Sequence, residues 1–297
     1  MMPLEPLAPI HTAHLFAPLH RELMTLLRGL SPDDWLRSTV ARNWCVRDVA
    51  AHLLDVDLRN LSVTRDGHVL PPDRDIANYR DLVRWINHLN ATGVETSRRC
   101  SVRVLTDLLD LTGLWVADMV EDLPPDGPAV FGVAWAGERT STHWMDTGRE
   151  YTERWHHQAQ LRDALGVPRL LARRWLEPLL HLSVRVLPVA CSALDVPIGS
   201  SVTLAVVPVP PDTATLSWTV TREPDGWRAW TGSPDLPFEA DTTAVSDVRR
   251  ARVRLAADDV WRVFYNALDE ESARTRATIE GDATLAARVL AARSVMV

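Results

Sequence analysis

The sequence predicts an α+β protein in which an N-terminal four-helix bundle is followed by a small α+β domain. Long segments with apolar residues at helical spacing fill the chain as far as residue 168. After residue 195 the pattern changes to short β-rich runs separated by turn residues. A helical stretch interrupted by Pro178 and Pro188 lies between the two parts. We therefore expect a bundle over residues 1–168, a helical linker over 169–195 and an α+β domain over 196–297.

The helices of the first part are predicted from the spacing of their apolar residues. The expected ranges are 14–30, 47–61, 75–92, 101–123 and 146–166. Ser31-Pro32 marks an additional short helical turn, because serine suits the N-cap and proline suits the first helical position. Residues 62–74 contain Gly67 and Pro71-Pro72 and are expected to form a loop. Long helices joined by loops are the pattern of a helix bundle.

The second part combines strands with shorter helices. Strands are expected at 202–207, 216–220, 227–230 and 248–255, with the turn Glu223-Pro224-Asp225-Gly226 before the third. Amphipathic helices are expected at 258–268 and 285–292. This mixture of separate strands and helices is typical of a small α+β domain.

Composition excludes several classes of function. The net charge of −7 argues against a general nucleic-acid-binding protein, which needs basic residues to neutralise phosphates. All 32 basic residues are arginine, so lysine Schiff-base chemistry and a lysine-bearing phosphate loop are excluded. No G-x-S-x-G motif is present, so a serine hydrolase has little support.

The cysteines and the apolar runs indicate where the protein works. The three cysteines are widely spaced and form no C-x-x-C pair, so neither a disulfide framework nor a thiolate zinc site is expected. No apolar run approaches the ~18 residues of a membrane span, and no signal-peptide pattern opens the chain. We expect a cytoplasmic protein with small-molecule partners, no membrane contact and no nucleic acid; its oligomeric state is open.

The helix expected over 146–166 carries a polar pair where core residues belong. Glu153, His157, Leu161 and Ala164 fall on one face at helical spacing. A buried carboxylate and imidazole are costly unless something neutralises them. Because a glutamate oxygen and a histidine nitrogen one turn apart can both point at one cation, a metal ion is the simplest candidate.

The helix expected over 47–61 offers a third ligand. His52 lies on its inward face between Val49 and Leu53. Bundle helices present inward side chains to a common axis, so His52 can meet Glu153 and His157 there. Three protein ligands leave one coordination position open, as in a catalytic zinc site. The alternative is that His52 is a hydrogen-bonded core histidine and that Glu153 pairs with an arginine such as Arg149.

Two of these segments, and a third near the C-terminus, resemble a known family. Residues 43–53, NWCVRDVAAHL, resemble the W-S/T-V-R-D-V-A-A-H-L signature of DinB-like thiol-dependent metalloenzymes. The nearest named group is the mycothiol-dependent maleylpyruvate isomerase family. Residues 150–158, EYTERWHHQ, resemble that family's second motif, and residues 279–290 are similar to the end of its C-terminal domain.

The resemblance implies a DinB-type four-helix bundle that carries a divalent metal, most simply zinc, and a C-terminal domain that helps to close the active site. The implied ligands are His52, Glu153 and His157, although nickel and iron(II) suit the same set. The implied co-substrate is a low-molecular-weight thiol: mycothiol, bacillithiol or glutathione. The implied enzyme is a thiol-dependent isomerase or S-transferase acting on a small, carboxylated substrate.

Further residues enter the site as candidates. His156 competes with His157 for the metal, but the family register and the apolar stripe favour His157. Arg149 is a candidate catalytic residue that holds a substrate carboxylate, with a surface salt bridge as the alternative. Substrate contacts are also expected from Ser141, Trp44 and Gln160.

Two positions depart from the family pattern. Cys45 replaces the usual serine or threonine and is a poorer N-cap, although Asp48 can still accept from the backbone there. Gln160 stands where the family often carries aspartate, so contacts around the metal can differ.

Two other functions use the same residues. The metal could activate water in a zinc-dependent hydrolase. Alternatively, the bundle could bind a metal or a small molecule without catalysis, as a stress-response protein. Binding of a low-molecular-weight thiol distinguishes the thiol-dependent enzyme from both the hydrolase and the non-catalytic binding protein.

Overall fold

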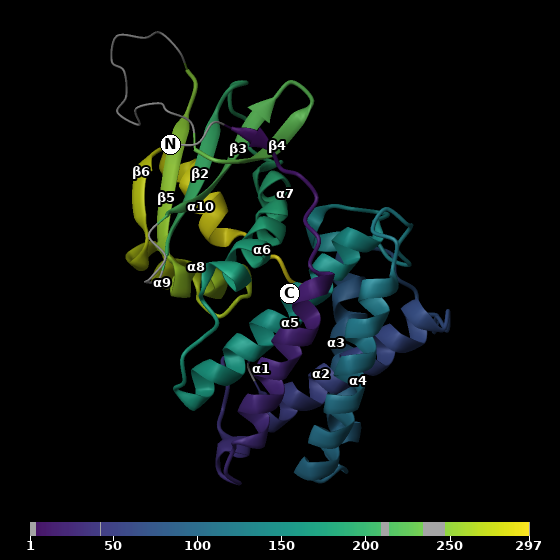
Figure 1. Ribbon diagram of the computed structural model, residues 1–297. Coiled ribbons are helices and arrows are strands. Elements are labelled where there is room, and N and C mark those ends of the chain that lie inside the picture. The colour runs from purple at the N-terminus through teal and green to yellow at the C-terminus, as the bar shows by residue number, and fades with distance from the viewer. Residues whose placement is uncertain (1–3, 42, 209–213, 234–246, 297) are drawn as a thin grey trace. The chain divides into compact units, whose positions relative to one another are not determined.

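The computed structural model describes residues 4–41, 43–208, 214–233 and 247–296. The chain divides into two compact units, coloured by residue number in Figure 1. One unit is helical and comprises Ile10–Ala134 and Glu138–Arg169, while the other contains a sheet and comprises Met1–Pro9, Trp135–Gly137 and Leu170–Val297. The predicted α+β fold class is confirmed. None of the described helices combines the length and the apolar content that crossing a bilayer requires.

Four helices of the helical unit form a bundle. They are α1 (Phe16–Arg28), α2 (Val46–Asn60), α4 (Val102–Asp122) and α5 (His143–Leu165). A fifth helix, α3 (Tyr79–Ser97), packs against α2. Aliphatic side chains of α1, α2 and α4, together with Leu161 of α5, make a continuous buried core. Burial of this apolar surface holds together the helices that later supply the site.

The ends of two helices differ from the sequence expectation. Helix α2 continues into a π-helical turn, η3 (Leu61–Arg65), where a loop was expected from residue 62. Helix α3 begins at Tyr79 rather than near residue 75, because the Asn78 side chain accepts from the Asp81 N–H at 3.1 Å and caps the helix there. The short turn predicted after Ser31 is present as η2 (Asp34–Leu36).

The other unit is built on a six-stranded sheet with the order β1-β4-β3-β2-β5-β6. Strands β2 and β5 are parallel, and the other neighbours are antiparallel. The strands are β1 (Glu5–Pro6), β2 (Ser201–Val207), β3 (Leu216–Glu223), β4 (Gly226–Thr231), β5 (Arg250–Ala256) and β6 (Thr278–Gly281). The strands expected at 202–207, 216–220, 227–230 and 248–255 are confirmed, whereas β6 was not predicted.

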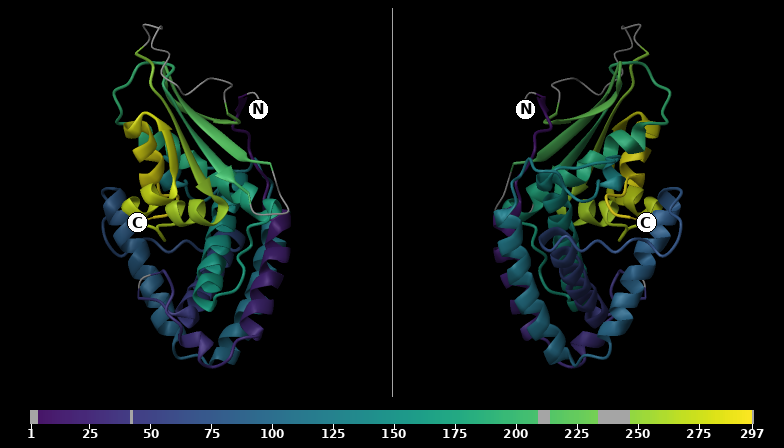
Figure 2. Two further views of the ribbon diagram at one scale, coloured as in Figure 1. Left: turned by 90° about the vertical axis from the view of Figure 1, so that its left-hand side faces the viewer. Right: turned by 90° about the vertical axis from the view of Figure 1, so that its right-hand side faces the viewer.

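Helices cover one face of this sheet, as Figure 2 shows. Along β5, Ala251, Val253 and Leu255 are buried while the intervening arginines are not, which is the alternation of a strand with one covered face. The helices are α6 (Arg173–Ser183), α7 (Leu187–Cys191), α8 (Ala257–Phe264), α9 (Glu270–Arg276) and α10 (Ala283–Ala291). Of these, α7, α8 and α10 contact the strands.

Candidate metal centre

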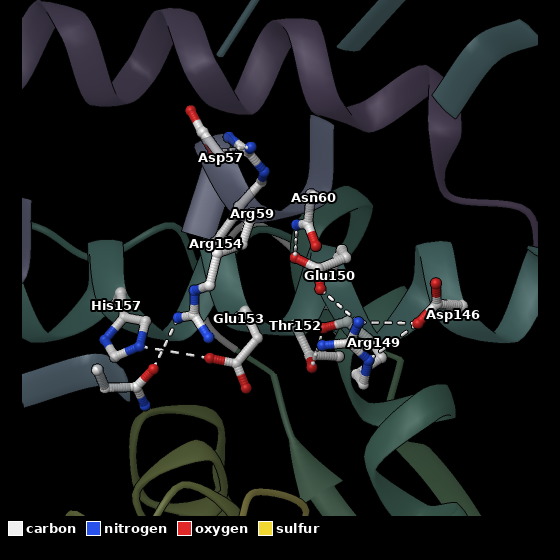
Figure 3. A network of polar contacts seen from close by, with 11 residues as sticks. Asp57, Arg59, Asn60, Asp146, Arg149, Glu150, Thr152, Glu153, Arg154 and His157 are labelled. Atoms are coloured by element: carbon white, nitrogen blue, oxygen red, sulfur yellow. Dashed lines mark hydrogen bonds and ion pairs between the residues drawn. The ribbon is translucent and has the colours of Figure 1, made fainter. Parts of the chain in front are cut away.

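Two helices bring three potential metal ligands together inside the bundle. His52 comes from α2, and Glu153 and His157 come from successive turns of α5. Each residue offers one ligand atom, and these atoms all lie within 4.8 Å of one another. Figure 3 shows the side chains of Glu153 and His157 turned toward each other. Among the described residues this is the one group with such an arrangement.

The orientation of His157 leaves a place for positive charge. Its Nδ1 lies 2.8 Å from Oε1 of Gln160, an oxygen that only accepts, so Nδ1 must donate. The Nε2 of a neutral ring therefore presents a lone pair toward Oε2 of Glu153, which is 3.4 Å away. Two acceptors face each other at that distance only if a proton or a cation lies between them. This Nε2–Oε2 distance is also close to the distance of about 3.3 Å between two ligand atoms of a tetrahedral ion with bonds of ~2.0 Å.

His52 is available to the cluster as a neutral third ligand. Its Nδ1 is buried and has no hydrogen-bond partner among the described residues. Burial, reinforced by the charges of His157 and Arg59, lowers the pKa of His52 well below its usual value despite the opposing charge of Glu153. The ring is therefore neutral at pH 7, and neutral imidazole is the form that binds metals.

Glu153 is ionised and provides the negative charge of the cluster. Burial alone would raise its pKa, but the neighbouring imidazoles of His156, His157 and His52 hold the pKa of this carboxyl well below its usual range. An ionised carboxylate and two imidazoles form a donor set that suits a divalent ion. The residues present therefore fit the implied metal.

His156 is committed to another contact. Its Nδ1 lies 2.9 Å from the carbonyl oxygen of Thr152, one turn earlier in α5. Its ring packs against that of His157 with centroids 4.0 Å apart. Burial, followed by the charge of His157, lowers the pKa of His156 to about 3. The geometry favours the His157 register over the His156 register.

The other residues singled out from the sequence lie at different distances from the cluster. Trp44 forms one wall, with its ring centroid 4.9 Å from that of His52 and 6.5 Å from that of His157. Gln160 holds His157 rather than facing open space. Ser141 makes its contacts within its own connector, where it donates to Glu138 and accepts from the Val133 N–H at 3.0 Å.

Arg149 is held by two carboxylates of its own helix. Its guanidinium lies 2.8 Å from Asp146 and 2.5 Å from Glu150, and Asn60 donates to Glu150 at 2.6 Å. Figure 3 shows this group turned along α5 toward Asp146, away from His157. Arg149 therefore forms a salt bridge, but with the buried Glu150 and with Asp146 rather than at the surface as the alternative expected.

Arg59 is a charged residue of this site that sequence reasoning missed. It lies seven residues after His52, two turns along the same face of α2, and helical side chains lean back toward the N-terminus. Its Nε lies 3.0 Å from Asp55 and its Nη2 lies 2.7 Å from Oδ1 of Asn90. Its charge reaches the cluster, because it contributes to the lowered pKa of His52. The spacing from His52 was the signal that could have found it.

A buried ion pair fixes α5 against its neighbours beside the cluster. Arg154 of α5 pairs with Asp57 of α2, and both side chains are buried. Thr112 of α4 donates to the other oxygen of Asp57 at 2.9 Å. Since Arg154 directly follows Glu153, this pair helps to position the α5 turn that carries two of the candidate ligands. At the start of α2, Asp48 accepts from the Cys45 N–H at 3.2 Å, as expected.

Comparison with known proteins gives one family match and two similar structures. A family model described as the mycothiol maleylpyruvate isomerase N-terminal domain matches residues 16–162. The crystal structure of a histidine-to-alanine mutant of the mycothiol-dependent maleylpyruvate isomerase is similar, with a TM-score of 0.51 and 12% identity over 90% of each chain. A second crystal structure of the mycothiol-dependent maleylpyruvate isomerase has a TM-score of 0.48 and 12% identity, covering 84% of this chain and 86% of that one. No curated protein sequence matches the chain. The first likeness shows a shared fold.

Proposed function

The helical unit of this chain belongs to the family of mycothiol maleylpyruvate isomerase N-terminal domains, and from this we propose that the protein is a metal-dependent enzyme that uses a low-molecular-weight thiol for isomerisation. The observation that carries the proposal is the convergence of His52, Glu153 and His157 on one point, with two acceptors facing each other there. Three such side chains can bind a cation and leave part of the cation's coordination sphere open.

We propose that these three side chains hold a divalent ion, with zinc as the first choice. Two imidazoles and one carboxylate also accept nickel or iron(II), so the donor set alone leaves the element open. A divalent ion held there would supply the positive charge that lowers the pKa of a thiol into the neutral range. Mycothiol is the first thiol to test, because the matching family is named for it; bacillithiol and glutathione are the alternatives.

The proposed reaction is the isomerisation of a conjugated double bond in a small carboxylated substrate. The thiolate sulfur adds to one alkene carbon, and the π electrons move onto the conjugated carbonyl oxygen, giving an enolate. The former double bond is now a single bond and can rotate. When the enolate electrons return, the C–S bond breaks, the thiolate leaves and the alkene re-forms in the other geometry. No proton is gained or lost overall, and maleylpyruvate is the first substrate to test.

Within this reaction Arg59 is the group that we propose for the substrate carboxylate. Its Nε lies within ion-pair distance of Asp55 and one Nη donates to Asn90, and these two contacts hold the planar group in place. A guanidinium held in this way can offer its remaining N–H groups to a carboxylate. Trp44 covers the rings of His52 and His157 and limits the access of water to them.

The metal is tested first, by elemental analysis of the purified protein and of single variants. His52→Ala, Glu153→Ala and His157→Ala should each lose the bound ion, because each removes one of three ligands. His156→Ala is the matched control on the same helix and should keep its metal. Full metal content in the His157→Ala variant would overturn the proposed ligand set, and loss in His156→Ala alone would show that the register is shifted by one.

The thiol is tested next, by titration calorimetry of the metal-loaded protein with mycothiol, bacillithiol and glutathione. Binding of one thiol, followed by conversion of maleylpyruvate that depends on that thiol, is the expected result. An Arg59→Gln variant should bind thiol normally but show a raised KM for substrate. A metal-loaded protein that binds none of the thiols and hydrolyses esters or amides would instead be the metal-activated-water hydrolase, and one with neither property would be a binding protein.

A further inference from the structure

Helix α4 presents an apolar stripe to solvent on the face opposite its core contacts. Five large apolar residues of this face are between 41% and 45% exposed: Val104, Leu108, Leu111, Leu114 and Trp115. Four of them, at positions 104, 108, 111 and 115, follow the three-and-four spacing of a helix-packing seam. The bundle core takes a different face of α4, on which Leu105, Leu109 and Val116 are fully buried. The stripe is therefore surplus to the packing of the bundle.

An exposed apolar stripe of this length on one helix has a free-energy cost in water and usually marks a contact surface. The seam positions 104, 108, 111 and 115 carry no charged side chain, while the exposed Asp107 and Asp118 lie beside them on the same face and the borders are polar. Arg28 of α1 pairs with Asp110 at 2.7 Å on one side, and the Arg65 guanidinium lies 5.8 Å from the Trp115 ring centre on another. An apolar centre with a polar rim is the composition of a protein interface.

We propose that this face of α4 pairs with the same face of a second copy of the chain, with the two helices antiparallel about a two-fold axis. The spacing of the stripe is self-complementary under such an axis. When the axis passes between residues 109 and 110, Leu108 meets the partner's Leu111, and Val104 meets the partner's Trp115. A small residue thus faces the largest one, and two leucines of equal size meet near the axis. An isologous contact requires this kind of self-match.

The charges at the two ends of α4 favour the same antiparallel arrangement. Basic residues precede and open the helix: Arg98, Arg99 and Arg103. Acidic residues close it: Asp118, Glu121 and Asp122. All six are exposed. In an antiparallel pair the basic end of each helix lies beside the acidic end of the other. The antiparallel helix dipoles also attract each other. A parallel pair would place like charges together.

The size of the contact sets the strength to expect. One helix face on each side places the interface at the low end of specific contacts, about 1,000–1,200 Å² in total. The pairing should therefore be reversible and concentration-dependent rather than permanent. This inference is independent of the proposed chemistry, because it rests on the solvent face of α4.

Sedimentation velocity on the full chain tests the pairing, at concentrations from about 1 to about 200 µM, where a contact of this size associates. The wild type should shift from monomer to dimer across this range. Leu108→Glu/Leu111→Glu should remain monomeric and should keep the wild-type far-UV circular dichroism, since both positions are exposed. Leu36→Glu, an exposed leucine in η2, is the matched control and should dimerise as the wild type does. A wild type that stays monomeric throughout, or a dimer that survives the double substitution, would overturn the proposal.

The antiparallel orientation has its own test. Arg103 lies close to the partner's Asp118 only when the helices run in opposite directions. Arg103→Asp and Asp118→Arg should each weaken the dimer several-fold at low salt, and the combined variant should restore it. Failure of the combined variant to recover would reject the antiparallel pairing.

Discussion

The hydrogen bond between Gln160 and His157 should govern the affinity for the metal. Gln160→Ala removes the acceptor that fixes the Nδ1 proton of His157 and directs Nε2 toward Glu153. The bond is 2.8 Å long and both side chains are buried, so water does not readily replace the lost oxygen. Loss of such an orienting partner typically weakens metal binding by about 10–100-fold. That factor corresponds to about 1.4–2.8 kcal/mol.

The assay is competition for zinc with a chromophoric chelator, performed on the wild type and on three variants. Gln160→Ala should show the predicted loss. Gln160→Glu should keep or exceed the wild-type affinity, because a carboxylate accepts the same hydrogen bond and adds negative charge. Gln158→Ala is the neighbouring control; its amide donates to the Leu19 carbonyl oxygen at 3.1 Å, outside the ligand cluster. If Gln160→Ala bound zinc as tightly as Gln158→Ala, the hydrogen bond would not be what orients His157.

Three further predictions concern stability and reactivity. Asp57→Ala leaves Arg154 buried without its carboxylate and should lower the free energy of unfolding by about 3–5 kcal/mol in urea titrations, whereas Asp57→Ala/Arg154→Met should lose less. Gly113→Ala should destabilise the protein by about 1–3 kcal/mol despite the better helix propensity of alanine, because the new Cβ would lie 2.1 Å from the His20 ring. Adding His20→Ala should recover part of this loss. A Gly113→Ala variant more stable than the wild type would contradict this packing. Burial raises the pKa of Cys191 to about 12 against the opposing charge of Arg288, so iodoacetamide at pH 8 should leave this thiol unmodified in the native protein and alkylate it in denaturant, as peptide mass spectrometry would show.

The bundle helices were predictable because their apolar residues repeat with the helical period over three or more turns. Helix α5 could be placed from its stripe and from Gly166, whose positive φ of 68° ends the helix. Shorter elements escaped prediction: α9 has a single buried residue, Ala273, and β6 is four residues long. The π-helical turn after α2 also escaped, because Gly67 and the following prolines indicated a loop and nothing in the sequence marks an i+5 bond.

The site was less predictable than the helices. Spacing alone pairs Glu153 with His157, but it cannot bring His52 beside them, because that contact depends on which bundle helices are neighbours. Arg59 was not predicted, because the candidate for the substrate carboxylate was Arg149, on the helix of the Glu153–His157 pair. The helical period places Arg59 on the His52 face, so the relevant spacing was seven residues within α2. Which carboxylates pair with Arg149 also follows only from the side-chain positions.

The proposed ligands come from helices that are far apart in the chain, and this has a consequence for the lifetime of the protein. An unfolded chain cannot present His52 together with the α5 pair, so an ion that binds them binds the folded state alone. Each tenfold excess of free ion over its dissociation constant then adds about 1.4 kcal/mol to the free energy of unfolding. Scarcity of the ion would therefore have two effects. It would inactivate the site, and it would expose the chain to proteolysis. The abundance of this protein in a cell should rise and fall with the supply of its metal.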